Sequence, residues 1–496
     1  MKQDKTVFPA DSYRQTVIEP IFNIFKQHFY QEMMAINYAH AIMLNEAAII
    51  SRDEASALLR GLKKIESEIN LTELKYSGEF EDLFFYLEKQ LVAELGIAIA
   101  GKLHTGRSRN DMSITIYKMK VKDLLQSFLE KLIGLTETLL QIAEENRDTV
   151  IIAYTHGQPA MPTTYGHYLA ALIEVLLRDL ERLLAAYRTT DKCSMGAAAI
   201  TTSGFDLNRE RVAELLGFEA VQENSYGCIA AVDYLGQVYS ALKILFINLG
   251  RFIQDLGQLT GFDLAHLYVP NEFVQISSIM PQKRNPVPVE HLRVMSSITV
   301  GYCDTVLNSL HNTPFTDMND SEDSLQMVGF KAFTEAEKVL HLITALLRGL
   351  EVNQDRIKKH IDRSFVTITE LAETLVRKEG ISFRQAHQLS SKLVKSLSGK
   401  NQKLSELKYG SFVDLFSEII GREPELTEEE LKTSLRPEYF VRIRNVYGGP
   451  GPDALQQALN RYYAELRQNK ATVQATNNFR FQAGKKLQEI VNTYLG

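Results

Sequence analysis

The segment ITIYKMKVKDLLQSFLEKLIGLTETLLQIAEEN, residues 114–146, decides the fold class. A helix of this length is well beyond the average globular helix of about 11–12 residues. It can bury its apolar stripe only against other helices of similar length, so we expect a bundle of long helices. The apolar residues of the segment recur at helical spacing: Leu125, Phe128, Leu129, Leu132, Leu135, Leu139 and Ile142.

The placement of proline extends this expectation to most of the chain. A proline in a helix interior costs about 3 kcal/mol, so long helices exclude it. Alternating strand patterns are almost absent, which indicates an all-α protein. Residues 234–249, YLGQVYSALKILFINL, are apolar on more than one face, so we expect neighbouring chains to help bury them. Proline is missing from residues 21–158, 163–269 and 315–423.

The composition is that of an ordinary globular protein. Its 496 residues, 45% of them hydrophobic, allow a large core and suggest two to four domains. The net charge of −6 and the scattered Lys and Arg argue against a nucleic-acid partner. The first fifteen residues are polar and no run of 18 apolar residues occurs, so we expect a cytoplasmic protein without membrane contact.

Cofactors are not expected from the motifs present. Cys193, Cys228 and Cys303 form no CxxC pattern and are interpreted as buried small apolar residues, not as disulfides or a zinc site. No HExxH, P-loop or GxGxxG motif suggests a metal or a nucleotide. The absence of GxSxG also disfavours acyl transfer.

Four polar clusters interrupt the helical pattern, and loops held by a rigid scaffold often carry binding groups. Three of them also have a structural explanation: the first as a capped helix start, the second as a loop with a structural histidine, the third as a basic surface loop. Together they offer a serine base, a lysine, amide and hydroxyl donors and a His–Glu pair, which suits proton abstraction beside a carboxylate. The clusters are GKLHTGRSRND (101–111), YTHGQPAMPTT (154–164), ISSIMPQKRNP (276–286) and VYGGPGPD (446–453).

The clusters also carry a family resemblance. SSIMPQKRNP resembles the signature loop of the fumarase, aspartase and argininosuccinate lyase superfamily, and HTGRSRND and YTHGQPA resemble its other two regions, in the same order. LAETLVRKEGISFRQAH (371–387) and RIRNVYGGP (442–450) resemble the C-terminal domain of argininosuccinate lyases. The resemblance implies an N-terminal helical domain (1–111), a central long-helix bundle carrying the signature loop (112–362) and a C-terminal helical domain (363–496).

The resemblance also implies a homotetramer, a common assembly with closed symmetry, in which three subunits build each active site. By the same resemblance, a base removes the proton next to a carboxylate, an aci-carboxylate forms, and the carbon–nitrogen bond of an N-substituted aspartate breaks to give fumarate and an amine. Ser277 is the implied base, His156 the proton-transfer partner oriented by Glu290, and Lys283 and Asn285 hold the carboxylate, with Arg284 as an alternative cation. The implied contacts to the succinyl part are Arg109, Asn110, Thr155 and Ser278.

The sequence departs from the family where argininosuccinate lyases hold the arginine half. The family's tyrosine, glutamine and lysine fall on Asp317, Glu322 and Leu325. Because these changes alter which charges the pocket can pair, they favour a cationic or polyamine leaving group that lacks the distal carboxylate of arginine. Further differences are Ile276 in place of a glycine, Asp82–Leu83–Phe84 in place of Asp-Ile-His, Ala231–Val232–Asp233 in place of Glu-Arg-Asp, and, in a loose alignment, Ile21 and Phe25 in place of serine and aspartate.

Three hypotheses follow. The chain is a lyase for an N-substituted aspartate other than argininosuccinate, resembling the ethylenediamine disuccinate lyases, or it is an argininosuccinate lyase proper with arginine contacts supplied by other residues. The third hypothesis, a non-catalytic structural protein similar to the lens crystallins of this family, is disfavoured by the retained site residues Ser277, His156, Lys283, Asn285 and Glu290.

Overall fold

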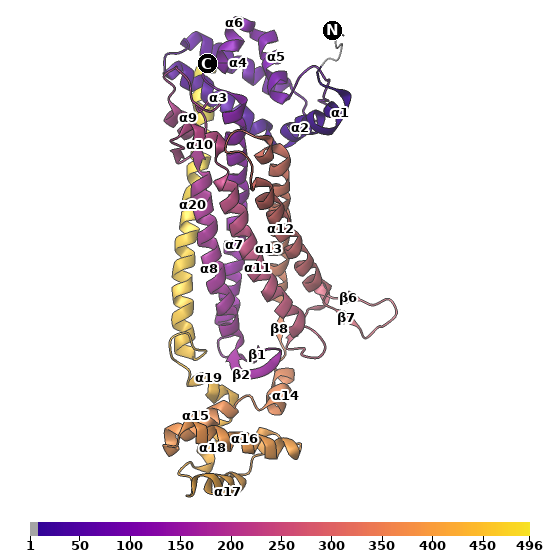
Figure 1. Ribbon diagram of the computed structural model, residues 1–496, viewed down its shortest axis with the longest axis vertical. Helices are drawn as coiled ribbons and strands as arrows, with labels where there is room; N and C mark the ends of the chain where they lie inside the picture. Colours follow the sequence, from indigo (N-terminus) through magenta and orange to yellow (C-terminus); the bar gives the residue numbers. More distant parts are fainter. Residues whose placement is uncertain (1–7) are drawn as a thin grey trace.

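The computed structural model describes residues 8–496 (Figure 1). Long helices lie side by side in an elongated bundle, with groups of short helices at both of its ends (Figure 1). The expected all-α fold is therefore confirmed. The long helices are α7 (Arg109–Glu145), α8 (Tyr165–Thr190), α11 (Asp233–Leu259), α12 (Val287–Leu310), α13 (Asp323–Gly349) and α20 (Pro452–Leu495).

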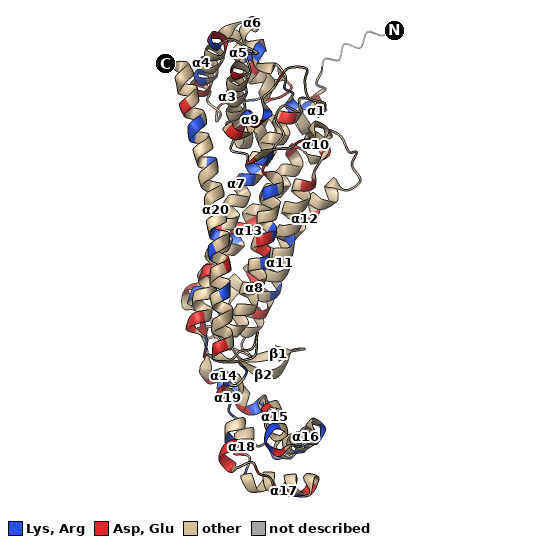
Figure 2. Ribbon diagram, turned by 90° about the vertical axis from the view of Figure 1, so that its left-hand side faces the viewer, with Lys and Arg blue, Asp and Glu red and all other residues tan. Residues whose placement is uncertain are grey.

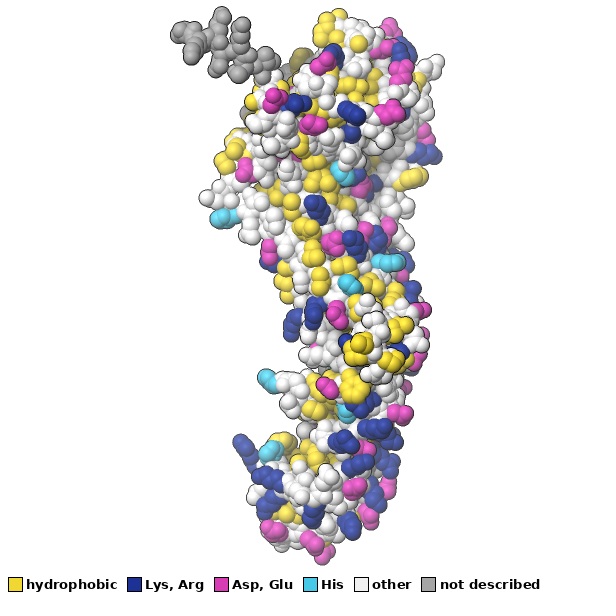
Figure 3. All heavy atoms as spheres, turned by 90° about the vertical axis from the view of Figure 1, so that its right-hand side faces the viewer, with side chains coloured by type: hydrophobic (Ala, Val, Ile, Leu, Met, Phe, Trp, Pro, Cys, Tyr) yellow, Lys and Arg dark blue, Asp and Glu magenta, His cyan; other side chains and the backbone are white. Residues whose placement is uncertain are grey.

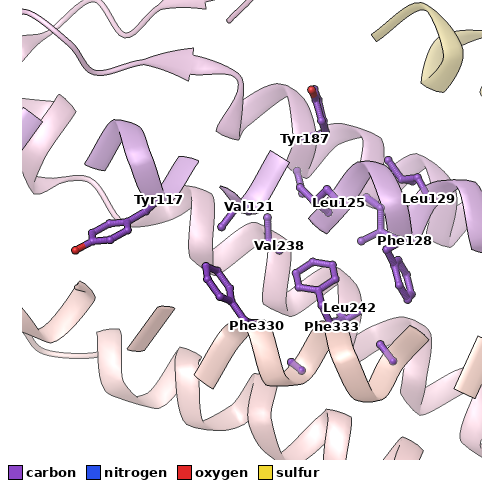
Figure 4. Packing of buried hydrophobic residues seen from close by; sticks show 14 of the residues in the cluster. Tyr117, Val121, Leu125, Phe128, Leu129, Tyr187, Val238, Leu242, Phe330 and Phe333 are labelled. Carbon is purple, nitrogen blue, oxygen red and sulfur yellow. The ribbon is translucent and has the colours of Figure 1, made fainter. Parts of the chain in front are cut away.

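Helix α7 forms the centre of the bundle. Ser108 caps its first turn, and Asp111 completes the capping box by accepting a hydrogen bond from the Ser108 amide. The predicted apolar stripe of α7 packs against α11 and α13, where Leu125 and Phe128 lie near Leu242 (Figure 4). Burying each side chain of this size contributes roughly 1.5–3 kcal/mol, so the stripe fixes the register of the neighbouring helices.

The short helices of the N-terminal region cover one end of the bundle, called here the upper end because Figure 1 draws it at the top. Two of the segments between residues 200 and 232 lie at the same end: α9 (Arg209–Leu215) and α10 (Ser225–Ala230). The helices of the N-terminal region are α1 (Asp11–Tyr13), η1 (Arg14–Ile18), α2 (Glu19–Ile24), η2 (Phe25–Phe29), α3 (Tyr30–Glu46), α4 (Arg52–Glu68), α5 (Leu83–Leu95), α6 (Ile97–Ala100) and η3 (Gly101–His104).

A small lobe forms the lower end and has a hydrophobic core of its own, which includes Leu375, Leu389 and Phe412. After the lobe, α20 returns to the bundle and packs along α7 and α8 (Figure 1). The domain boundaries after residues 111 and 362 stay predictions. The lobe contains α14 (Gln354–Ser364), α15 (Ile368–Glu379), α16 (Phe383–Gly399), η6 (Leu404–Glu406), α17 (Tyr409–Ile420), α18 (Glu428–Ser434) and α19 (Pro437–Arg442).

The strands are few and short. The 154–164 cluster, expected as a loop, lies instead in an antiparallel hairpin of β1 (Val150–Thr155) and β2 (Gln158–Thr164). Its prolines are tolerated because both strands of a two-stranded ribbon are edge strands. The other pairs are β3 (Lys192–Cys193) with β4 (Ala220–Val221), β5 (Leu267–Tyr268) with β8 (Glu351–Val352), and β6 (Gln275–Ile276) with β7 (Arg284–Asn285).

The surface of the long helices mixes both signs of charge (Figure 2). Apolar side chains nevertheless reach the surface along the face that Figure 3 turns to the viewer. Among residues 8–496, no helix is long and apolar enough to cross a membrane. The three cysteines are free and buried.

Candidate active site

The upper end of the bundle gathers the residues predicted to face the substrate from the first cluster and from the 317–325 segment. Arg109 and Asn110 form the first turn of α7, and the Asn110 amide donates a hydrogen bond to Asp317. The Arg109 guanidinium lies 2.8 Å from the Asp82 carboxylate and 3.3 Å from that of Glu81. Arg109 is therefore already paired with two carboxylates of its own chain.

Three carboxyl groups crowd the start of α13, next to η5 (Asn319–Ser321). Burial, together with the nearby charges of Asp323 and Asp317, raises the pKa of Glu322 to about 7. Burial also raises the pKa of Asp323 to about 6, although the Tyr117 hydroxyl donates a hydrogen bond to it. The pKa of Asp317 is raised by burial as well. A cation that binds beside these carboxyl groups stabilises their ionised forms.

The other positions that the sequence predicted for the amine half are apolar. Phe84 and Leu325 are buried, and Val232 is the N-cap residue of α11. The charged groups near these positions are Asp317, Glu322 and Asp323, together with Arg109, whose charge also acts on Glu322. Asp317 and Glu322 lie close enough in the folded chain to influence each other electrostatically, and their part in binding an amine stays a prediction.

At the lower end, the tip of the β1–β2 hairpin carries Thr155 and His156, both exposed. His156 has a φ of 53°, a left-handed backbone conformation that is uncommon for residues other than glycine. A residue held in this way often marks a functional turn. His156 lines a cavity of about 690 Å³ between the hairpin, α8, α11 and the segment around Arg444.

The signature loop extends from the lower half of the bundle between β6 and β7 (Figure 1). The Ser277 hydroxyl accepts a hydrogen bond from the Met280 amide, 3.0 Å away, which tightens the start of the loop. Ser278 and Lys283 are exposed, and the Asn285 side chain donates to the Gln275 carbonyl at 3.1 Å. The loop thus exposes Ser278 and Lys283, while Ser277 is half-buried.

The single chain does not bring the predicted site residues together. At about 1.5 Å per residue, the 37 residues of α7 hold Arg109 roughly 55 Å from the start of the β1–β2 hairpin. Glu290 lies exposed in the first turn of α12, and within residues 8–496 no hydrogen bond joins it to His156. A small substrate cannot touch both ends of one bundle at once.

The sequence interpretation missed two parts of the upper end. Asp323 and Tyr117 form a buried hydrogen-bonded pair beside the predicted Glu322. Asp111 is fully buried, with its pKa raised to about 7 by that burial, and it accepts hydrogen bonds from the Gly196 and Ala198 amides. The adjacent Glu322–Asp323 pair was a visible signal for the first, while the contact of Asp111 with residues far along the chain left no signal.

Comparison with known proteins shows the family of the chain. Residues 7–301 match the family model described as lyase, and residues 365–442 match the one described as argininosuccinate lyase C-terminal. "Argininosuccinate lyase 2" of Agrobacterium fabrum is 46% identical over 488 residues, covering 98% of this chain and 97% of that protein.

Solved structures of lyases are similar to the chain over nearly its whole length. EDDS lyase in complex with formate matches with a TM-score of 0.86 and 26% identity over 99% of this chain and 97% of that one. A variant of EDDS lyase with bound fumarate matches with a TM-score of 0.86 and 26% identity over 98% of this chain and 99% of that one. By its two family matches and its 46% identity to a relative of nearly the same length, the chain belongs to the argininosuccinate lyase family of the fumarase/aspartase superfamily and is a carbon–nitrogen lyase.

Proposed function

We propose that this lyase releases fumarate and a cationic amine other than arginine from an N-substituted aspartate. The observation that carries the proposal is the acidic upper end, where Asp317, Glu322 and Asp323 crowd together while Arg109 is paired with Asp82 and Glu81. This is the carbon–nitrogen lyase chemistry of the family, of the ammonia or amidine type, with a rewritten amine pocket.

In the proposed reaction, Ser277 takes the proton from the carbon next to the distal carboxylate of the succinyl part. The electron pair of that carbon–hydrogen bond moves into the carboxylate and forms the aci-carboxylate, whose charge Lys283 and Asn285 stabilise. The carbon–nitrogen bond then breaks, its electron pair leaves with the amine, and His156 assists the proton transfer. Each preorganised donor of this kind contributes about 100- to 1000-fold in rate in comparable sites.

The amine half of the proposal follows from charge. A leaving group with an ammonium tail pairs with Asp317 and Glu322 and relieves their mutual repulsion. The distal carboxylate of argininosuccinate would instead face these carboxylates, and a mispaired buried charge costs on the order of 2 to 5 kcal/mol. That difference corresponds to roughly 30- to 4000-fold in kcat/KM.

We further propose a cytoplasmic homotetramer with no nucleic-acid or membrane partner. The roughly 55 Å between the two ends of α7 supports it, because complete sites then require the upper end of one chain beside the lower ends of others. Apolar side chains on α11 and α12 give a second argument, since the long helices expose Ile244 (40%), Ile247 (47%), Val294 (52%) and Ile298 (42%). Helices that are apolar beyond their own core contacts are typical of subunit interfaces.

The test compares kcat/KM for argininosuccinate with that for the mono-aspartate adduct of a diamine, followed by fumarate absorbance. We expect the diamine adduct to be cleaved at least 30-fold better. Running the reverse reaction with fumarate and a panel of amines identifies the preferred amine. Turnover of argininosuccinate at about 10⁴ M⁻¹s⁻¹ or more would mean that the pocket has been misread.

The second candidate is argininosuccinate lyase proper, and the name of the relative that is 46% identical favours it. This candidate needs a cation for the distal carboxylate of arginine from another subunit. Glu322→Gln separates the two hypotheses. In a diamine lyase, loss of this carboxylate weakens binding of the diamine adduct. In an argininosuccinate lyase, it removes a repulsion of the substrate's distal carboxylate. Complete absence of turnover with every substrate would support the third hypothesis, a structural protein.

A further inference from the structure

The foot of the signature loop is held by Arg284, which points away from the loop tip. Its guanidinium donates to the Asn271 side chain and, at 2.7 Å, to the Val269 carbonyl. The same group lies 4.5 Å from the centre of the Tyr268 ring. Three partners within four residues of the preceding segment therefore engage one side chain of the loop.

The strand beneath these contacts is itself tied to the lower end of the bundle. Leu267 and Tyr268 pair with Val352 and Glu351, and the Asn353 amide donates to the His266 carbonyl at 2.8 Å. The Arg284 contacts thus join the loop to a fixed part of the molecule. The side chains of Ile279 and Lys283 within the loop are exposed, and so is Arg284 outside the three contacts given above.

We propose that Arg284 is a positioning residue, which fixes the foot of the signature loop so that Ser277 and Lys283 reach the substrate in one orientation. The inference rests on the proposed function of that loop. Arg284 acts through Asn271, Val269 and Tyr268 and does not touch substrate, so Lys283 is the cation that faces the developing dianion.

The chemistry of arginine explains why this position suits it. A guanidinium offers a planar fork of donors that bonds two acceptors at once and stacks on an aromatic ring, whereas a lysine ammonium is a point charge on a flexible stem. Pairing of β6 with β7 alone spans only two residues on each side, so it defines the direction of the loop weakly. A displacement of about 1 Å at a reacting group is enough to cost on the order of 100-fold in rate.

The test is a double-mutant cycle on kcat and KM with Arg284→Met, Asn271→Ala and the double variant. Positioning predicts that Arg284→Met lowers kcat about 10- to 100-fold with little change in KM. It also predicts that Asn271→Ala has a smaller effect, and that the double variant resembles Arg284→Met alone, because coupled residues are not additive. Fully additive effects would overturn the inference.

Arg284→Lys adds a second criterion, since it keeps the charge and loses the fork. We expect it to be nearly as impaired as Arg284→Met. Recovery of most of the activity in Arg284→Lys would show that the charge itself is needed at the substrate, which contradicts a positioning role. Arg384→Met, an exposed arginine of α16 in the lobe, controls for loss of one positive charge and is expected to retain full activity.

Amide hydrogen exchange of residues 277–283 in the assembled protein reads out the loop without reference to activity. Arg284→Met and Asn271→Ala are both expected to speed exchange there at least threefold, and Arg384→Met to leave it unchanged. Unchanged exchange in both loop variants would overturn the inference. Faster exchange combined with full activity of Ser277→Ala would support the positioning of the loop by Arg284 and would reject the proposed role of the loop in catalysis.

Discussion

The two ends of the bundle hold their polar residues in opposite ways. At the upper end, Arg109, Asn110 and Asp323 each have a partner in their own chain; Asp323 is buried, and Asp317 and Glu322 are half-buried. At the lower end, His156 and Lys283 are exposed. Buried charges are stable only when they are paired, while exposed charges need no partner.

This difference separates two tasks. The upper end is assembled by folding, so its substitutions change stability as well as substrate choice. The lower end is exposed, and in the proposed assembly other chains complete it, so its substitutions are expected to change the rate and leave stability almost unchanged. The following variants sharpen or break this comparison.

Ser277→Ala should have the largest effect. Removal of the proposed base is expected to lower kcat by 1000-fold or more, because no neighbouring group replaces it. The melting temperature should stay within about 1 °C of that of the parent protein, since the residue lies on a loop outside the core. The measurement is fumarate release together with calorimetry, and Ser411→Ala on an exposed turn of α17 is the control. Retention of most activity would reject Ser277 as the base.

Mixing Ser277→Ala with His156→Asn should restore activity if different chains supply these residues. After random exchange of equal amounts of subunits, about a quarter of the sites would combine two intact residues. Activity is then expected to rise several-hundred-fold above that of either variant alone. Subunit exchange is verified by mass spectrometry of the mixed assemblies. No recovery after verified exchange would place both residues in sites built by one chain.

Asp111→Ala tests the upper end as part of the folded core. Three backbone amides, those of Ser108, Gly196 and Ala198, would lose their acceptor. A buried donor left without a partner costs about 1–3 kcal/mol, so we expect a loss of roughly 3 kcal/mol or more in the free energy of unfolding. Chemical denaturation measures it, with Asp414→Ala on α17 as an exposed control. Unaltered stability would contradict the view that the upper end is fixed by folding.

Glu322→Gln should produce a small change in melting temperature, and the size of this change depends on pH. The pKa of Glu322 rises from 4.5 to about 7 in the folded chain, so folding opposes its ionisation. That penalty is complete above pH 7, decreases as the pH falls, and is absent below about pH 4.5. We therefore expect the variant to melt about 1–2 °C above the parent at pH 8 and with no difference near pH 4.5. A lower melting temperature at pH 8 would show that Glu322 is stabilised as a carboxylate.

The long helices were the most predictable part of the fold. The stripe from Leu125 to Ile142 predicted a helix over residues 114–146, and α7 covers Arg109–Glu145. Ser108 and Asp111 were visible as a possible helix start because capping depends on neighbouring residues. Local patterns of this kind need no knowledge of distant contacts.

The candidate site was only partly predictable. The sequence named Asp317 and Asn110, but their hydrogen bond joins residues 207 positions apart, which no local pattern encodes. It treated the segment around His156 as a loop, because prolines hid the hairpin that gives this residue its φ of 53°. Arg284 was a candidate cation for the substrate, and the direction of its side chain depends on Tyr268 and Asn271, which the motif does not contain.

The position of α20 has a consequence for biosynthesis. This helix covers α7 and α8 with Leu459, Leu466 and Val473, yet it is translated about 300 residues after α7 ends. At about 5–20 residues per second, the stripe beneath it waits roughly 15 to 60 s on the ribosome for its cover. During this interval the nascent chain exposes a long apolar surface that invites aggregation, so productive synthesis of this protein depends on what shields the bundle before its last helix emerges.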